Sequence, residues 1–190
     1  MFQHFDLRDG GTLDYDPTFY ALPDAGELFT RLRAETPWRQ ERSRLGPFPR
    51  LTAWYADAGL TYSYSGVTHI GLEWTATLAQ IRRDVERAAG VTFNSLLLNL
   101  YRDGSDSIGY HADDEPELGV NPIIASLSFG TARPFHLKHK KTREKQTFAL
   151  AHGSLLLMGG TCQHHWLHGV PKMKLPVGER INLTFRRIFA

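Results

Sequence analysis

Two segments of the chain carry apolar residues at helical spacing. The first spans residues 24–35 and ends before Pro37, and the second spans residues 73–89 and is followed by Gly90. A proline beyond the last periodic residue and a glycine at the C-cap are both typical of helix ends. The two apolar stripes consist of Leu28, Phe29 and Leu32, and of Leu78, Ile81, Val85 and Ala88.

The rest of the chain alternates between apolar and polar residues or forms short apolar runs, as β-strands do. Residues 1–20 predict short strands around a turn at Asp9-Gly10-Gly11. The other predicted strands are 38–45, 50–55, 59–66, 93–102, 107–112, 122–130, 133–139, 146–151, 153–159, 163–169 and 180–189. Two helices followed by many strands predict an α+β chain whose sheets close as a jelly roll or sandwich. No repeat or linker interrupts residues 1–190, so we expect one domain.

Composition and charge narrow the class of protein. The 190 residues are 42% hydrophobic, enough for a sizeable core, and the formal charge of +2 permits a nucleic-acid partner without requiring one. A single cysteine, Cys162, excludes an internal disulfide and fits a reducing cytoplasm. The polar N-terminus predicts no signal peptide, and no apolar run is long enough for a membrane span. We expect a cytoplasmic monomer, acting at the nucleoid if the source is bacterial.

The first candidate chemistry is His111-Ala112-Asp113. In an extended chain, residues two apart point to the same face, so the imidazole and the carboxylate would lie together. Two histidines and one carboxylate on one side of Fe(II) form a site that leaves coordination positions open for chemistry. A chance pairing is the simpler interpretation of these two residues alone, so the hypothesis needs a second histidine from elsewhere in the chain.

A segment near the C-terminus offers three imidazoles, His164, His165 and His168. If this segment is extended, His164 and His168 share a face and His165 lies opposite. Gly169 and Pro171 argue against a helix here. A lone histidine on a sheet is usually structural, and spacing does not choose between His164 and His168 as a ligand.

Residues 180–186 alternate without a break between a polar and an apolar face. Arg180 and Arg186 lie on the polar face, where two guanidinium groups would bind a dicarboxylate, since the planar donor fork matches a carboxylate. Asn99 and Tyr101 share a face of another predicted strand and could donate hydrogen bonds to the same ligand. The alternative is a half-exposed strand whose polar face contacts water.

Two further patterns have both a structural and a functional interpretation. Tyr62 and Tyr64 share a face of a predicted strand, either as half-buried rings, the commoner fate, or as a platform on which a base stacks. Five basic residues fall within a predicted hairpin, which is either a solvated tip or an edge that binds phosphates. They are Lys138, Lys140, Lys141, Arg143 and Lys145.

Together these motifs resemble the AlkB family of Fe(II)- and 2-oxoglutarate-dependent dioxygenases, which repair alkylated nucleobases. The matching runs are N-L-Y at 99–101, H-A-D at 111–113, W-L-H-G-V-P-K at 166–172 and R-I-N-L-T-F-R at 180–186. The resemblance covers roughly residue 35 to the end, and Ala58–Gly66 and His111–Glu115 place it nearest the duplex-DNA repair homologues. It implies a double-stranded β-helix with two main flanking helices, a nucleotide-recognition part over 1–90 and a catalytic core over 91–190.

The resemblance also implies a role for each matching residue. The implied iron ligands, which are the catalytic residues, are His111, Asp113 and His168. The implied 2-oxoglutarate contacts are Asn99, Tyr101, Arg180, Thr184 and Arg186. The implied contacts of the extruded base are Tyr62, Tyr64, Asp114 and Glu115, with His111 on the face opposite Tyr64, and Arg50 would hold the flipped strand.

The implied activity is oxidative demethylation of 1-methyladenine and 3-methylcytosine type lesions in DNA, with RNA as an open alternative. It requires base flipping, Fe(II), 2-oxoglutarate and O2, and it releases formaldehyde, succinate and CO2. The segment 44–48 departs from relatives that drive an aromatic wedge into the duplex, so Leu45 would be a smaller wedge and strand preference stays open. The alternatives are an oxygenase acting on a protein or small molecule, and a nucleic-acid-binding module with a vestigial metal site.

Overall fold

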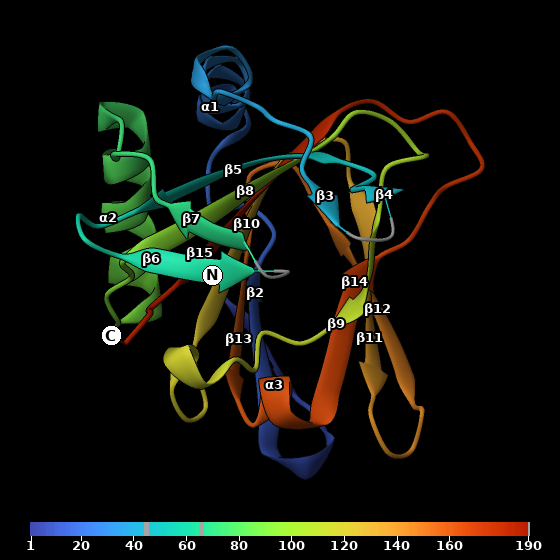
Figure 1. Ribbon diagram of the computed structural model, residues 1–190. Coiled ribbons are helices and arrows are strands. Elements are labelled where there is room, and N and C mark those ends of the chain that lie inside the picture. Colours follow the sequence, from blue (N-terminus) through green and yellow to red (C-terminus); the bar gives the residue numbers. More distant parts are fainter. Residues whose placement is uncertain (44–45, 65–66, 190) are drawn as a thin grey trace.

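The computed structural model describes residues 1–43, 46–64 and 67–189, and for residues 43, 61–64 and 67–70 it describes the backbone alone. Within these residues, two antiparallel sheets face each other (Figure 1). In spatial order the larger sheet comprises β1 (Gln3–Asp6), β2 (Gly11–Asp16), β13 (Ser154–Gly160), β10 (Ile124–Gly130), β15 (Arg180–Arg186), β8 (Ser95–Tyr101) and β5 (Leu51–Ala56). The smaller sheet comprises β12 (Lys145–Leu150), β11 (Arg133–His139), β14 (Trp166–Val170) and β9 (Ile108–His111).

Shorter elements complete the described part of the chain and confirm the predicted α+β jelly roll. The helices are α1 (Leu22–Glu35), α2 (Ala76–Ala89) and α3 (Cys162–His165), with 3-10 turns η1 (Arg8–Gly10) and η2 (Pro116–Leu118). Two small ribbons pair β3 (Arg42–Ser43) with β4 (Gly46–Pro47), and β6 (Thr61–Tyr64) with β7 (Val67–Ile70). No helix among the described residues combines the length and apolarity that crossing a bilayer requires.

Helices α1 and α2 cover the outer face of the larger sheet (Figure 1). The hydroxyl of Thr75 accepts the Leu78 N–H at the start of α2, and Gly90 ends the helix with a left-handed φ of 69°. Leu78, Ile81 and Val85 of the predicted stripe are buried in a cluster that also contains Leu98 of β8 and Leu183 of β15, and Ala88 packs against this cluster partly buried. The predicted helix over 73–89 is therefore confirmed, with a later start.

A second apolar cluster lies between the two sheets. It includes Leu156 of β13, Leu137 of β11 and Trp166 of β14. Because the larger sheet is covered on both faces, the polar face of β15 is not in water. Arg180 is 1% exposed and Asn182 is 7% exposed, so the alternative of a water-facing strand is wrong.

Three predicted segments differ from the structure. The described residues of the segment 38–45 form only the two-residue β3 and an isolated bridge at Arg39. Strand β7 was not predicted. The strand predicted over 163–169 begins as α3, a single turn in which Thr161 O accepts the His164 and His165 N–H groups. This turn lets the chain cross from β13 in the larger sheet to β14 in the smaller one.

Candidate active site

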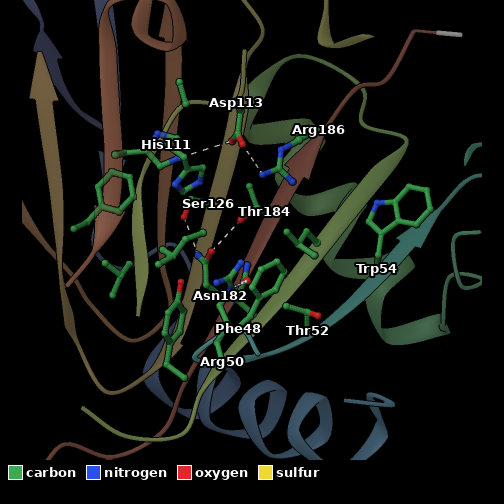
Figure 2. A pocket seen from close by; sticks show the side chains of 18 of the residues that line it. Phe48, Arg50, Thr52, Trp54, His111, Asp113, Ser126, Asn182, Thr184 and Arg186 are labelled. Atoms are coloured by element: carbon green, nitrogen blue, oxygen red, sulfur yellow. Dashed lines mark hydrogen bonds and ion pairs between the residues drawn. The ribbon is translucent and has the colours of Figure 1, made fainter. Parts of the chain in front are cut away.

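A cavity of about 150 Å³ lies between the two sheets and is lined from both of them. Strands β8 and β15 supply its wall from the larger sheet, and β9 and β14 supply its wall from the smaller one. Figure 2 shows His111, Asp113 and Arg186 together at one end, with Arg50 and Phe48 toward the other. The cavity is therefore the place where the separately predicted motifs meet.

Antiparallel pairing of β9 with β14 places His168 directly opposite His111. The two imidazole centres lie 4.3 Å apart. Asp113 follows the end of β9 by two residues, and its Oδ2 lies 3.9 Å from His168 Nε2. One ligand atom from each of the three residues lies within 4.8 Å of the others. His164, the alternative that spacing left open, is exposed on α3 and lies outside this group.

The hydrogen bonding and the electrostatics of this group of residues suit a cation. His111 Nδ1 lies 2.9 Å from Gly109 O, and since a carbonyl only accepts, Nδ1 is the donor and Nε2 is the nitrogen that a metal would bind. Burial, together with the neighbouring His111 and Arg186, lowers the pKa of His168 to about 3. Burial would raise the pKa of Asp113, but Arg186 and the two imidazoles outweigh it and hold that pKa at about 2.

The carboxylate of Asp113 has one satisfied oxygen and one open oxygen. Its Oδ1 accepts from Arg186 Nη2 at 2.8 Å, whereas the buried Oδ2 has no hydrogen-bond donor among the described residues. A buried carboxylate oxygen without a partner is costly, and a divalent cation would satisfy it. Two neutral imidazoles and one carboxylate are the donor set that suits Fe(II) in oxygenases, so these residues fit the predicted metal.

A second group of possible ligands, Asp9, His139 and His165, also lies within 4.8 Å. Here His139 Nδ1 accepts the Thr142 N–H at 3.1 Å, so the proton is on Nε2, which faces Asp9 Oδ2 at 3.0 Å. No lone pair of His139 is then available to a metal. The contact between His139 and Asp9 joins η1 to the β11–β12 hairpin.

Arg180 is a buried cation with unused donors at the cavity wall. Its Nη2 donates to Ser128 Oγ at 2.9 Å, and its guanidinium carbon lies 5.2 Å from the centre of the Tyr101 ring. Its Nε and Nη1 have no well-aligned acceptor in the described part of the chain. Burial and the nearby Arg133 lower the pKa of Arg180, so an anion bound here would be stabilised strongly. The geometry fits a carboxylate ligand.

The polar groups between Arg180 and the metal-ligand cluster form a hydrogen-bonded chain. Thr184 Oγ1 donates to Asn182 Oδ1 at 3.0 Å, and Asn182 Nδ2 donates to Ser126 Oγ at 2.8 Å (Figure 2). Asn99 Oδ1 accepts from Arg50 Nε at 2.7 Å. Arg50, expected along the flipped strand, is thus buried in the cavity beside Asn99, one of the expected co-substrate contacts.

Only some of the expected base contacts have side chains among the described residues. Glu115 is half-buried and lines the cavity, whereas Asp114 is exposed and accepts from Lys140 Nζ at 2.9 Å. Tyr62 and Tyr64 lie on β6, but their side chains fall outside the described residues, as does Leu45.

Three residues of the site were missed by the sequence analysis. Ser126 and Ser128 alternate with apolar residues along β10, a signal that could have identified a polar face directed at the cavity. Gln163 accepts the Asp113 N–H at 3.0 Å. No local pattern marks Gln163, because its partner lies 50 residues away.

Comparison with known proteins gives several matches. A family model described as the 2OG-Fe(II) oxygenase superfamily matches residues 13–186. The alpha-ketoglutarate-dependent dioxygenase alkB homolog 3 of Rattus norvegicus is 42% identical over 190 residues, which cover 91% of this chain and 63% of that protein. The DNA oxidative demethylase ALKBH2 of Homo sapiens is 41% identical over 186 residues, covering 94% and 70%. The chain thus spans less than two thirds of the rat relative.

Solved structures show a likeness in fold. The structure of OsALKBH1 has a TM-score of 0.72 to this chain, covering 97% of it and 100% of that chain, at 17% sequence identity. At this identity the likeness concerns the fold alone, and it agrees with a double-stranded β-helix built from the two facing sheets.

Proposed function

Because the chain belongs to the AlkB family of the 2OG-Fe(II) oxygenase superfamily, we propose that it oxidatively demethylates alkylated bases in DNA. The proposed substrates are bases of the 1-methyladenine and 3-methylcytosine type. The observation that carries the proposal is the meeting of His111, Asp113 and His168, whose ligand atoms lie within 4.8 Å of one another. The same cavity contains the guanidinium of Arg180, whose Nε and Nη1 have no acceptor among the described residues.

The metal and the co-substrate would bind to different residues of the cavity. His111, Asp113 and His168 would hold Fe(II), and Arg180 would bind the distal carboxylate of 2-oxoglutarate. Iron, 2-oxoglutarate and O2 together supply an oxidant able to hydroxylate a methyl group, with formaldehyde, succinate and CO2 as final products. The protein's own part is positioning and exclusion of water. Arg186 keeps Asp113 ionised, and Asn99, Tyr101 and Thr184 would orient the co-substrate.

Recognition of the lesion would fall to Tyr62, Tyr64 and Glu115. Flipping a base costs a few kcal/mol, least for a lesion that pairs badly, and stacking on Tyr64 would return about 1–3 kcal/mol. A methylated ring that carries positive charge adds cation–π attraction to the stacking. The Glu115 carboxylate would favour this cationic base over the neutral product. Tyr62 would meet the polar edge of the base.

Two proposed substrate contacts already have protein partners. Asp114 pairs with Lys140, and Arg50 donates to Asn99. Contact of either residue with nucleic acid would require it to exchange or share this partner. We therefore expect Asp114 and Arg50 to change partners when nucleic acid binds.

The tip of the β11–β12 hairpin supports a nucleic-acid substrate. Lys141, Arg143 and Lys145 are exposed there, and Arg143 has a φ of 64°. A left-handed backbone conformation favours glycine or asparagine, so an arginine at this position costs conformational energy. Its side chain places a positive charge at the tip of the hairpin. These side chains would contact phosphates, whereas Lys140 is engaged with Asp114.

The proposal is tested by a demethylation panel with Fe(II) and 2-oxoglutarate. The substrates are 1-methyladenine and 3-methylcytosine in DNA and in RNA, each single-stranded and double-stranded. We expect formaldehyde and the unmodified base from at least one DNA substrate, and loss of both products in His111→Ala. The matched control is His164→Ala, which removes an exposed imidazole outside the cluster and is expected to leave turnover unchanged.

Other outcomes of the demethylation panel would contradict the proposal in different ways. Formation of succinate with a protein or small-molecule substrate, but with no methylated oligonucleotide, would place the activity in another class of oxygenase. Absence of iron-dependent succinate under all conditions would contradict an enzymatic function and favour a binding module. Equal loss in His111→Ala and His164→Ala would contradict the ligand assignment.

A further inference from the structure

The metal-ligand segment leaves its sheet just before Asp113. Strand β9 ends at His111, so the Asp113 N–H has no strand partner, although the residue is only 3% exposed. A buried backbone N–H must find an acceptor elsewhere. The side chain of Gln163 supplies it, because its Oε1 accepts this N–H at 3.0 Å.

Gln163 is placed between two ligand-bearing segments. It lies in α3, which leads directly into β14 and so to His168 (Figure 1). The residue is 1% exposed, and its Nε2 contacts Met158 Sδ at 3.8 Å. An amide nitrogen cannot accept an N–H, so only one orientation of the amide satisfies Asp113. The side chain therefore ties the segment carrying Asp113 to the segment carrying His168.

Lys140 reinforces the same connection from the β11–β12 hairpin. Its Nζ donates to the main-chain oxygen of Gln163 at 3.0 Å and to Asp114 Oδ2 at 2.9 Å. One ammonium group thus contacts α3 on one side and the residue after Asp113 on the other. The connection between the two segments is made twice, once by an amide side chain and once by a lysine.

We propose that Gln163, supported by Lys140, is the positioning residue that fixes Asp113 as a metal ligand. The inference rests on the proposed metal site. Arg186 holds Oδ1 of Asp113 and Gln163 holds its backbone, which leaves Oδ2 directed at the two imidazoles. Loss of a group that orients a ligand typically lowers metal affinity about 10- to 100-fold.

The test is a Co(II) titration of metal-free protein, followed by the d–d absorption of the bound ion. Gln163→Met keeps the approximate size of the side chain and removes the acceptor, and Gln163→Glu keeps an oxygen acceptor. We expect Gln163→Met to bind Co(II) about 10- to 100-fold more weakly with an altered spectrum, and Gln163→Glu to retain the wild-type spectrum. Gln80→Met, on the outer helix α2, is the matched control and is expected to behave as wild type.

A second readout does not depend on metal. In the metal-free protein, we expect the Asp113 amide proton to exchange with solvent faster in Gln163→Met than in wild type, since its acceptor is gone. A merely structural loss of stability would speed exchange throughout the core and leave the Co(II) spectrum of the folded fraction unchanged.

The outcomes separate this inference from the function on which it rests. Wild-type protein that binds no Co(II) would overturn the metal site and the inference together. Wild-type affinity and spectrum in Gln163→Met would overturn the inference alone, as would a Gln163→Glu variant as weak as Gln163→Met. If Gln163→Met does not fold, Lys140→Met takes its place, and unchanged Co(II) binding in that variant would overturn the proposal.

Discussion

Arg180 illustrates how one side chain sets the chemistry of the cavity. Its guanidinium is buried at the wall, and Ser128 and the Tyr101 ring occupy only part of its binding capacity. A charge held in this way without a bound anion is costly, and this cost is recovered when a carboxylate arrives. The part of the cavity beside Arg180 therefore favours an anion before any shape is considered.

Replacing Arg180 with lysine tests whether the planar fork matters. Arg180→Lys keeps the charge but loses the paired donors, so we expect the Kd for 2-oxoglutarate to rise about tenfold or more, equal to at least about 1.4 kcal/mol. Calorimetry with metal-loaded protein measures the change. Arg187→Lys, at an exposed arginine, is the control. Equal affinities in the two variants would show that Arg180 does not bind the co-substrate.

His168 predicts how the stability of the metal-free protein depends on pH. Its pKa is about 3 in the folded protein and near 6.5 in the unfolded chain. Between these values the unfolded chain binds a proton that the native state excludes, so the free energy of unfolding falls as pH falls from 6.5 toward 3. One such group contributes a slope of up to about 1.4 kcal/mol per pH unit. Urea unfolding from pH 7.5 to 4.5 is expected to show a shallower slope in His168→Gln, and identical slopes would contradict this.

The hairpin of β11 and β12 is the element expected to bind phosphates. Reversing its three exposed charges, as K141E, R143E and K145E together, is expected to weaken duplex binding. The slope of log K against log salt is expected to become shallower by about 0.9 for each phosphate that the hairpin no longer neutralises. Fluorescence anisotropy over a range of salt concentrations measures both effects.

The control for the hairpin reverses two charges on the outer helix. R83E and R87E change exposed arginines of α2, which covers the face of the larger sheet away from the cavity. If both sets of variants change the salt slope equally, binding depends on net charge and not on the hairpin.

Among the helices and strands, those with a long periodic pattern were predictable from the sequence, and the short ones were not. The unbroken alternation of β15 predicted which residues face inward, and the stripe of α2 with its glycine cap predicted that helix. The single turn α3 has no measurable period, and the two-residue β3 is held by its partner strand. The contact of Gln163 with Asp113 arises only when distant segments pack, so no local pattern encodes it.

At the scale of the whole molecule, the two sheets carry different parts of the proposed site. The smaller sheet and the segment after β9 carry the proposed metal ligands, whereas β8 and β15 of the larger sheet carry Asn99, Tyr101 and Arg180. Bound metal and 2-oxoglutarate would therefore connect the sheets across the cavity. Ligands that bind only the folded state raise its stability according to their concentration.

This division predicts a combined effect on thermal stability. Co(II) at about 100 times its Kd is expected to stabilise the protein by about 2.7 kcal/mol. Adding 2-oxoglutarate is expected to raise the Tm further than either ligand alone, because it joins the second sheet to the first. Differential scanning fluorimetry measures both steps, and a chelator reverses them. Persistence of the Co(II) shift in Asp113→Ala would contradict the proposed site.

The ion pair between Arg186 and Asp113 has a consequence for the order in which the enzyme is loaded. Because a guanidinium already pairs with Asp113, the acidic member of the proposed ligand set, a divalent ion would not be neutralised by its own carboxylate ligand. The other charged lining residues, Arg50, Arg180, Glu41 and Glu115, balance in formal charge, so the bound ion would make the cavity positive. A lesion that is itself cationic would be repelled until the dianionic co-substrate has arrived. We expect methylated oligonucleotide to bind the metal-loaded protein more weakly before 2-oxoglutarate is added than after. The metal and the co-substrate would then both be bound before the damaged strand enters the site.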